Sequence, residues 1–326
     1  MVAGTRDPLL APFPYFGGKR TIASTVWRAF GDVKQYIEPF CGSCAVLLSA
    51  PAAASLEVVG DANGFIANFW RATVAQPEEV ARHADYPVLH IDLGARHGWL
   101  MQQRDRLGAE LQDPLWPGDA RVAGWWLWGQ CSWIGSGWCE WAGQVPHAGD
   151  AGRGIQALGQ VPHASNAGRG IQSVVESRKD GGASSGYEPW TSGGRTAMRW
   201  LRQLADRMER VRVVHGAWNR CLNSHYGGTS TAVFLDPPYR AYESLYGVSA
   251  PVANECEVWA REHPELRVAL CGHRGDYHLP GWTAHNWVRG RSTYAGTKTT
   301  AEECVWFSPA CHALEDRQVS LFPGAP

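Results

Sequence analysis

The chain has 326 residues, which is enough to bury one large core together with a sizeable insertion. It contains no run of 18 apolar residues, and its amino terminus lacks the charged start and long apolar stretch of a secretory signal peptide. These features argue against a membrane protein and favour a cytoplasmic one. The nine cysteines are scattered along the chain, which is typical of reduced thiols. Cys41/Cys44 and Cys304/Cys311 resemble two unlike halves of a zinc site, so we expect ordinary thiols there and no metal.

The formal net charge of the chain is −1, but the charged residues are distributed unevenly along it. Residues 1–142 hold 11 Lys/Arg and 14 Asp/Glu, residues 143–220 hold 11 and 6, and residues 221–326 hold 8 and 11. A basic middle third is typical of a nucleic-acid contact confined to one module, and equally of a solvated, arginine-rich surface. Charge alone does not separate these two interpretations.

The first block of the chain predicts alternating helices and strands. Helical spacing over 19–31 is followed by a short strand at 34–40 and a helix from 45, then by a strand at 56–61 and a helix over 64–76. This rhythm is typical of a parallel sheet with helical crossovers.

The middle of the chain predicts a different kind of structure. Residues 86–142 read as helical, with six tryptophans between 124 and 141, which favour a packed core over base stacking. The segment "GQVPHAGDAGRGIQ" (143–156) recurs as "GQVPHASNAGRGIQ" (159–172). Two short copies rich in Gly and Pro do not make a solenoid, so we interpret 143–172 as two copies of one extended turn.

The last block returns to an α/β pattern. It predicts a helix over 196–211, strands at 211–218 and 230–238, a helix over 252–264, a strand at 267–273 and a terminal pair of strands within 283–309. Residues 1–85 and 195–326 are therefore expected to form one α/β domain, and residues 86–194 an insertion into it.

Three short motifs carry chemical information. "PYFGGKR" (14–20) has adjacent glycines, which let backbone approach a ligand, and a lysine able to meet a carboxylate. "YIEPFCGSCAVLL" (36–48) reads as strand, tight turn and helix, and Asp61 ends the next strand, where an acid can bind ribose hydroxyls. "DPPY" (236–239) directly follows an apolar strand and is the most specific of the three.

Taken in this order, the motifs resemble the Dam-type, alpha-group adenine-N6 DNA methyltransferases, and most closely the subset carried by phages and prophages. The resemblance covers about 12–75 and 195–310. It implies a Rossmann-like, S-adenosylmethionine-dependent methyltransferase sheet, with the inserted 86–194 as a mostly helical or loop region for DNA recognition. Double-stranded DNA is the implied partner, in a bacterial or phage-infected cell, and no obligate protein partner is inferred.

The resemblance also implies roles for individual residues. Cofactor contacts are expected from Tyr15, Phe16, Gly17, Gly18, Lys19, Pro39, Phe40, Gly42, Ser43, Asp61, Trp218 and Asp236. Two positions depart from the family pattern: Cys44 stands where a glycine is usual, and Ala217 where relatives often have an acid. The contacts to the cofactor's adenine are therefore open, with Trp218 as a packing surface.

The residues Asp236, Pro237, Pro238 and Tyr239 are the expected catalytic group. The exocyclic amine of adenine is a poor nucleophile, because its lone pair is delocalised into the ring. The Asp236 carboxylate and the Pro237 carbonyl can accept both N–H bonds and favour a pyramidal nitrogen. Tyr239 offers a flat face for a base taken out of the stack.

Alternatives remain for both the substrate and the function. The same chemistry could act on cytosine N4, on adenine in RNA or on a protein glutamine; Asp236 favours adenine. A DNA-binding protein that kept the fold and lost catalysis is the alternative from another class. In the repeat, His147, Arg153, His163 and Arg169 are the expected DNA contacts, and phosphate contact through the arginines predicts relaxed or short sequence specificity.

Overall fold

The computed structural model describes residues 9–13, 19–132, 138–139, 191–222, 225–239, 252–287 and 303–314. Several residues singled out in the sequence lie outside these ranges: Tyr15, Phe16, Gly17, Gly18, His147, Arg153, His163, Arg169 and the whole repeat at 143–172. Their predicted roles stay predictions.

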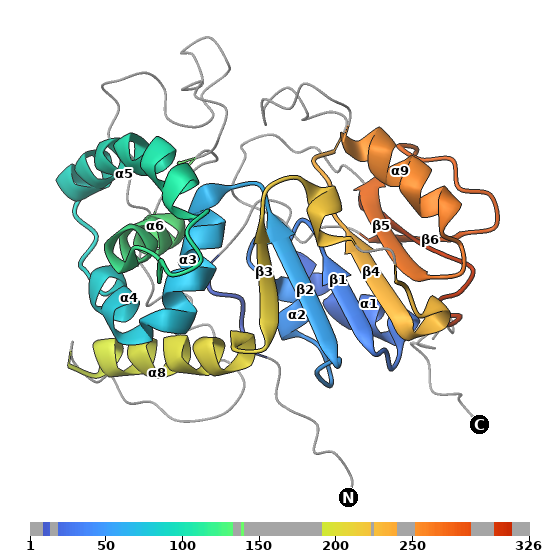
Figure 1. Cartoon of the computed structure of the whole chain (residues 1–326), viewed down its shortest axis with the longest axis horizontal. Helices are drawn as coiled ribbons and strands as arrows, with labels where there is room; N and C mark the ends of the chain where they lie inside the picture. The colour runs from blue at the N-terminus through green and yellow to red at the C-terminus, as the bar shows by residue number, and fades with distance from the viewer. Residues whose placement is uncertain are drawn as a thin grey trace, which may run out of the picture.

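A seven-stranded, mostly parallel sheet forms the centre of the molecule (Figure 1). Its strand order is β3-β2-β1-β4-β5-β7-β6, and only β7 runs antiparallel to its two neighbours. The strands are β1 (Gln35–Glu38), β2 (Leu56–Asp61), β3 (Val211–His215), β4 (Thr231–Leu235), β5 (Arg267–His273), β6 (Thr283–Trp287) and β7 (Glu303–Phe307). This mixed α/β sheet is the Rossmann-like methyltransferase fold expected from the sequence.

Helices connect the strands and cover both faces of the sheet. The described helices are η1 (Lys19–Thr21), α1 (Ala23–Phe30), α2 (Ala45–Leu48), α3 (Gly64–Ala75), α4 (Pro77–Ala84), α5 (His90–Glu110), α6 (Ala120–Ser132), α8 (Thr191–Met208), η3 (Trp218–Cys221), η4 (Gly228–Ser230) and α9 (Val252–Glu262). No helix among the described residues has the length and apolar character needed to cross a membrane.

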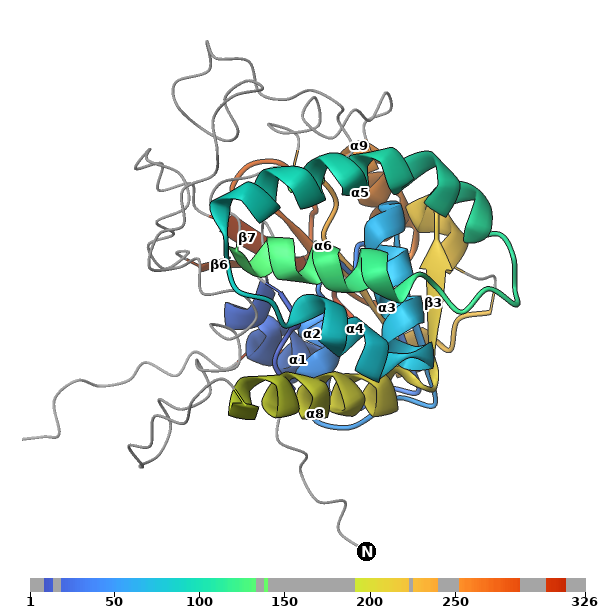
Figure 2. The ribbon, with the colours of Figure 1, turned by 90° about the vertical axis from the view of Figure 1, so that its left-hand side faces the viewer.

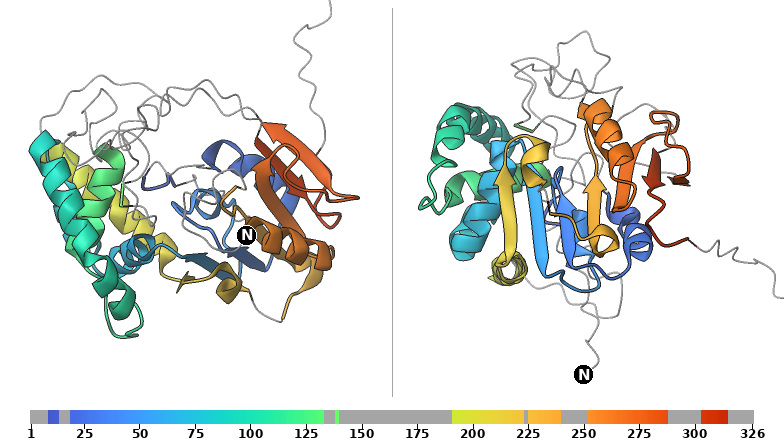
Figure 3. Two further views of the ribbon diagram at one scale, coloured as in Figure 1. Left: turned by 90° about the horizontal axis from the view of Figure 1, so that it is seen from above. Right: turned by 45° about the vertical axis from the view of Figure 1, so that its right-hand side comes forward.

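Side chains point alternately to the two faces of the sheet along each strand, and this divides the core into two clusters. In β4, Ala232 and Phe234 pack with α1 and α2, whereas Val233 and Leu235 pack with α9 and η3. Because successive side chains of a strand point to opposite faces, a sheet covered on both sides needs apolar residues at every position. All five residues of β4 are buried for this reason, and Figure 3 shows the sheet between α9 and the α1–α2 side.

A second group of helices lies beside the β3 edge of the sheet. Figure 2 shows α5, α6, α4 and α8 one below another on this side. Their apolar residues continue the α1–α2 core without a break, through α3. Trp126 and Trp128 are fully buried and Trp138 is nearly so, which confirms the core interpretation for these tryptophans.

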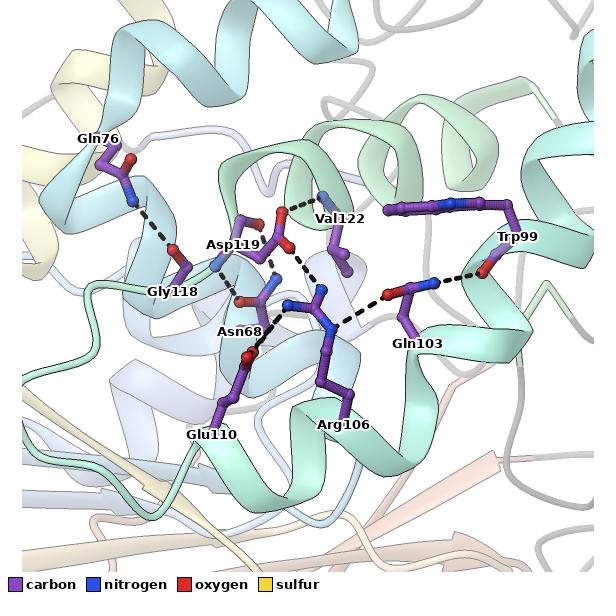
Figure 4. Close-up of polar contacts among 9 residues, drawn as sticks. All are labelled: Asn68, Gln76, Trp99, Gln103, Arg106, Glu110, Gly118, Asp119 and Val122. Carbon is purple, nitrogen blue, oxygen red and sulfur yellow. Dashed lines mark hydrogen bonds and ion pairs between the residues drawn. The ribbon is translucent and has the colours of Figure 1, made fainter.

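Polar contacts fix the helices α3, α5 and α6 to one another (Figure 4). Asp119 accepts a hydrogen bond from the backbone N–H of Val122 at the start of α6 (2.9 Å), and its other carboxylate oxygen lies 2.6 Å from the Arg106 guanidinium of α5. Asn68 of α3 pairs twice with the backbone of Asp119, at 2.8 and 3.1 Å. Asp119 therefore caps α6 and joins it to two other helices.

Every strand and helix predicted from the sequence within the described residues is present. Helix α4 was not predicted as a separate element, although Pro77 at its first position and Glu78 and Glu79 in its first turn are ordinary start signals. Helix α8 begins at Thr191, earlier than the predicted helix. The short β1, of four residues, ends before the Pro39-Phe40 turn.

Candidate active site

The candidate site lies where the direction of strand order reverses. β1 pairs with β2 on one side and with β4 on the other, and all three strands are parallel. Crevices outside the carboxyl ends of strands at such a point are the usual ligand sites of open α/β sheets. Glu38, Asp61 and Asp236 stand at or directly after the ends of β1, β2 and β4, so three acids meet this edge.

The turn after β1 uses left-handed backbone. Gly42 has φ 44° and Cys44 has φ 53°. Glycine adopts this region without cost, whereas a residue with a Cβ does so uncommonly. The structure therefore gives a physical reason for the glycine usual at the position of Cys44, and shows that Cys44 adopts the same backbone at a steric cost.

Asp61 links this turn to the end of β2. Its two carboxylate oxygens accept the backbone N–H groups of Gly42 (3.0 Å) and Asn63 (2.9 Å). Burial raises the pKa of Asp61 to about 6, although these hydrogen bonds work in the opposite direction. The acid is held in a fixed orientation, and each oxygen has a further lone pair for a ligand hydroxyl.

Two aromatic rings stand over the ends of β1 and β3. Phe40 and Trp218 lie nearly parallel, with ring centroids 6.2 Å apart and an interplanar angle of 20°. The Trp218 indole N–H donates to the Glu255 carboxylate of α9 at 3.0 Å, which fixes the ring's orientation. Ala217, one of the two departures from the family pattern, is exposed beside it.

The predicted catalytic group directly follows β4. Asp236 and Pro238 are partly exposed, whereas Pro237 and Tyr239 are buried. Lys19 lies under this segment, with its ammonium 2.9 Å from the Asp236 carboxylate and 5.1 Å from the centre of the Tyr239 ring. The lysine of the Gly-Gly-Lys motif thus meets a carboxylate, and that carboxylate is Asp236.

Burial and the neighbouring negative charges have opposite effects on the pKa of Lys19. Burial alone would lower the pKa of its ammonium, but the nearby Asp236 and Glu303 carboxylates outweigh that effect and raise the pKa above its usual value. Glu303, the first residue of β7, lies 4.0 Å from the ammonium. The lysine is therefore held in its charged form between two carboxylates.

Glu38 is a further buried acid at the same edge. It accepts hydrogen bonds from the Tyr36 hydroxyl (3.0 Å) and from the backbone N–H of Leu47 (3.2 Å). Burial raises its pKa to about 8 against the lowering effect of these bonds, and the negative charge of Asp236 raises it further. At neutral pH its protonated form prevails, and it joins β1 to α2.

The structure groups the described site residues in three contacts. Lys19 meets Asp236 and Tyr239, Gly42 meets Asp61, and Phe40 stacks on Trp218. Pro39 and Ser43 are buried in the turn between them.

Sequence reasoning missed Glu38 and Glu303. An acid within the quoted Glu-Pro-Phe motif was an available signal for Glu38. Only the β5–β7 pairing reveals Glu303, because it comes from the far end of the chain.

The cysteines do not form a metal centre within the described residues. No three side chains of the His, Cys, Asp or Glu type gather there as a metal-binding group. All nine cysteines are free, and burial raises the pKa of both Cys41 and Cys44. Buried thiols with raised pKa values are poor nucleophiles and poor metal ligands.

Comparison with known proteins gives one family. Residues 15–90 match the model of the D12 class N6 adenine-specific DNA methyltransferases. The match spans η1, the turn after β1, Asp61 and α3, and it ends before Asp236. No curated protein matches the chain. Residues 15–90 are therefore similar to the D12 class N6 adenine-specific DNA methyltransferases, and the seven-stranded, mostly parallel sheet is consistent with a Rossmann-like methyltransferase fold.

Proposed function

We propose that the protein transfers a methyl group from S-adenosylmethionine to the N6 amine of an adenine that is flipped out of duplex DNA. The observation that carries this proposal is the position of Asp236-Pro237-Pro238-Tyr239. This segment follows β4 directly, beside the reversal point of the sheet, in a chain whose residues 15–90 match the family model. We propose relaxed or short sequence specificity.

The residues at the sheet edge fit a nucleoside-type cofactor. Asp61 is a carboxylate oriented by two backbone N–H groups, suited to accept ribose hydroxyls. Phe40 and Trp218 offer flat apolar faces for an adenine ring. When bound, S-adenosylmethionine supplies a methyl group already activated as a sulfonium.

The remaining chemistry belongs to the chain's own residues. Asp236 and the Pro237 carbonyl are proposed to accept the two N–H bonds of the target amine and turn its lone pair toward the methyl group. The proline rings fix the direction of that carbonyl. Asp236 also stabilises the positive charge on nitrogen until the amine loses a proton. Catalysis is then mainly positioning for an in-line transfer.

Mass spectrometry of nucleosides tests the proposal. Unmethylated duplex DNA is incubated with the protein and S-adenosylmethionine and digested, and the modified nucleoside is identified. The proposal expects N6-methyladenine. N4-methylcytosine would redirect the same chemistry to another amine, and methylation of RNA alone would exclude the DNA substrate. Tight DNA binding with no modified nucleoside would instead favour a catalytically inactive DNA-binding protein.

A further inference from the structure

Three charged side chains from distant parts of the chain meet under the catalytic segment. The Lys19 ammonium lies 2.9 Å from the Asp236 carboxylate and 4.0 Å from that of Glu303. The side chains of Lys19 and Glu303 are only 4% and 7% exposed, whereas that of Asp236 is 18% exposed. Substrate can therefore approach Asp236, and the other two groups lie behind it.

Lys19 by itself would oppose the proposed role of Asp236. A carboxylate paired at 2.9 Å with an ammonium has much of its charge neutralised, and is a weaker acceptor for an amine. Methyl transfer also places positive charge on the amine nitrogen, which a nearby ammonium disfavours, and most strongly in a buried site. A Lys19–Asp236 pair without a third partner would carry no net charge.

Glu303 changes this balance because it adds a second negative charge beside Lys19. With both carboxylates ionised, the three groups carry a net charge of −1. Among the described residues, the Cys271 thiol and the Tyr239 phenol also lie near Lys19. Burial raises the pKa of each well above its usual value, so both are neutral and neither replaces Glu303.

Resting on the proposed function, we propose that Glu303 is a positioning residue that shares the Lys19 ammonium and thereby leaves Asp236 enough negative charge to hold the target amine. The sharing is electrostatic and does not require Lys19 to move. Neither the family match, which ends at residue 90, nor the motifs of the sequence include Glu303.

Kinetics of charge-changing variants test this role. Glu303→Gln should lower kcat by about tenfold, the equivalent of one pKa unit of interaction, with the Kd for S-adenosylmethionine unchanged. Glu303→Asp, which keeps the charge, should retain more activity. The double variant Lys19→Met/Glu303→Gln restores the net charge of −1, so its kcat at saturating cofactor should exceed that of Glu303→Gln. A double variant as slow as Glu303→Gln, or a Glu303→Gln enzyme at the parent rate, overturns the proposal.

Glu57 provides a matched control. It is also a buried glutamate with a cationic partner, because Arg207 donates to its two oxygens at 2.6 and 2.8 Å. It lies near the start of β2, at the opposite end of that strand from Asp61. Glu57→Gln should lower stability and leave kcat per folded molecule unchanged, which separates a general loss of a buried ion pair from an effect on Asp236.

A readout without catalysis separates this proposal from the proposed function. The coupling between Lys19 and Asp236 is measured by unfolding of Lys19→Met, Asp236→Asn and the double variant, in the parent and in the Glu303→Gln and Glu303→Asp backgrounds. If Glu303 shares the Lys19 ammonium, the coupling energy between Lys19 and Asp236 should be larger in both variant backgrounds than in the parent, and largest in Glu303→Gln. Equal coupling in all three overturns the proposal. A larger coupling in a protein that methylates no substrate would contradict the proposed function and support the sharing.

Discussion

Charged residues have different surroundings in the helices beside the sheet and at the sheet edge that carries the candidate site. In the helices beside the sheet, Arg106 binds Asp119 and Glu110, and Arg96 stacks on Trp128 and Tyr86 at 4.2 and 4.5 Å. At the sheet edge, Asp61 and Glu38 have pKa values raised by burial to about 6 and about 8. Ion pairs and cation–π contacts join helices in the first region, whereas in the second region burial raises the pKa of two acids that lie at the predicted site.

We infer from this difference that the contacts of the helices support the fold and that the acids of the sheet edge support the proposed chemistry. A chain gains no stability from keeping acids at a desolvated edge, so strongly raised pKa values there point to a functional site. The arginine and tryptophan contacts of the helices have a sufficient explanation in packing. The predictions below test that division, beginning with the largest expected effect.

Asp236→Ala should lower methyl transfer by at least about a hundredfold, the lower range for a positioned catalytic group. Asp236 is partly exposed at a strand end, so the variant should fold. Steady-state kinetics with unmethylated DNA and circular dichroism measure the two properties. A folded variant with near-normal turnover would remove Asp236 from the catalytic group.

Asp61→Ala should weaken S-adenosylmethionine binding by about 1.5–3 kcal/mol, the range for hydrogen bonds to a charged group. DNA affinity should change less. Because the pKa of Asp61 is raised to about 6, affinity of the parent for the cofactor should fall as pH drops below about 6, whereas the variant should lack this dependence. Calorimetric titration at pH 5.5 and 7.5 compares them, and equal profiles would argue against Asp61 as a ligand.

Tyr239→Ala should weaken engagement of the flipped base by about 1–3 kcal/mol if a full stacking contact is lost. Tyr239→Phe should be mild, because the Tyr239 hydroxyl is buried with no hydrogen-bond partner among the described residues. Single-turnover rates over a range of DNA concentrations measure the difference. Comparable damage from both variants would give the hydroxyl the main role.

Asp119→Ala should destabilise the fold by about 1–2 kcal/mol, because α6 loses its amino-terminal cap and the contact with Arg106. Transfer per folded molecule should not change. Urea unfolding gives the stability, and Arg106→Ala is the matched variant that breaks the ion pair and keeps the cap. If Arg106→Ala costs as much as Asp119→Ala, the cap contributes little.

Glu38→Gln should change stability by an amount that depends on pH. The folded pKa of about 8 exceeds the ordinary value of 4.5, so the folded state holds a proton that the unfolded state has lost between these limits. Stability from this proton is present at low pH and is lost as pH rises toward about 8. The free energy of unfolding of Glu38→Gln should therefore increase relative to that of the parent as pH rises, by at most about 1.4 kcal/mol per pH unit. Unfolding measured from pH 5 to 8 tests this. A constant difference would contradict the raised pKa.

Much of the fold followed from local patterns. Alternation and helical spacing predicted the strands and most helices, because both faces of the sheet are covered and the pattern is strong. Helix α4 was missed because the predicted helix ends at residue 76 and no element was assigned to the residues that follow, although α4 begins at once with Pro77.

The site was predictable only where its residues belong to a motif. Asp61 and Asp236 follow strands within recognisable motifs and were predicted as site residues, whereas Glu303 reaches Lys19 only through the antiparallel pairing of β7 with β5. The contact of Glu255 with Trp218 likewise joins α9 to the end of β3. Such contacts depend on how distant elements pack, which no local spacing records.

Single-turnover methyl transfer by Asp236→Ala and Asp119→Ala, compared at equal amounts of folded protein, tests the division between the two regions most directly. The account predicts that Asp119→Ala transfers at the parent rate despite its lower stability, and that Asp236→Ala loses at least about a hundredfold per folded molecule. Equal losses in both variants, or a slow Asp119→Ala beside an active Asp236→Ala, would contradict it.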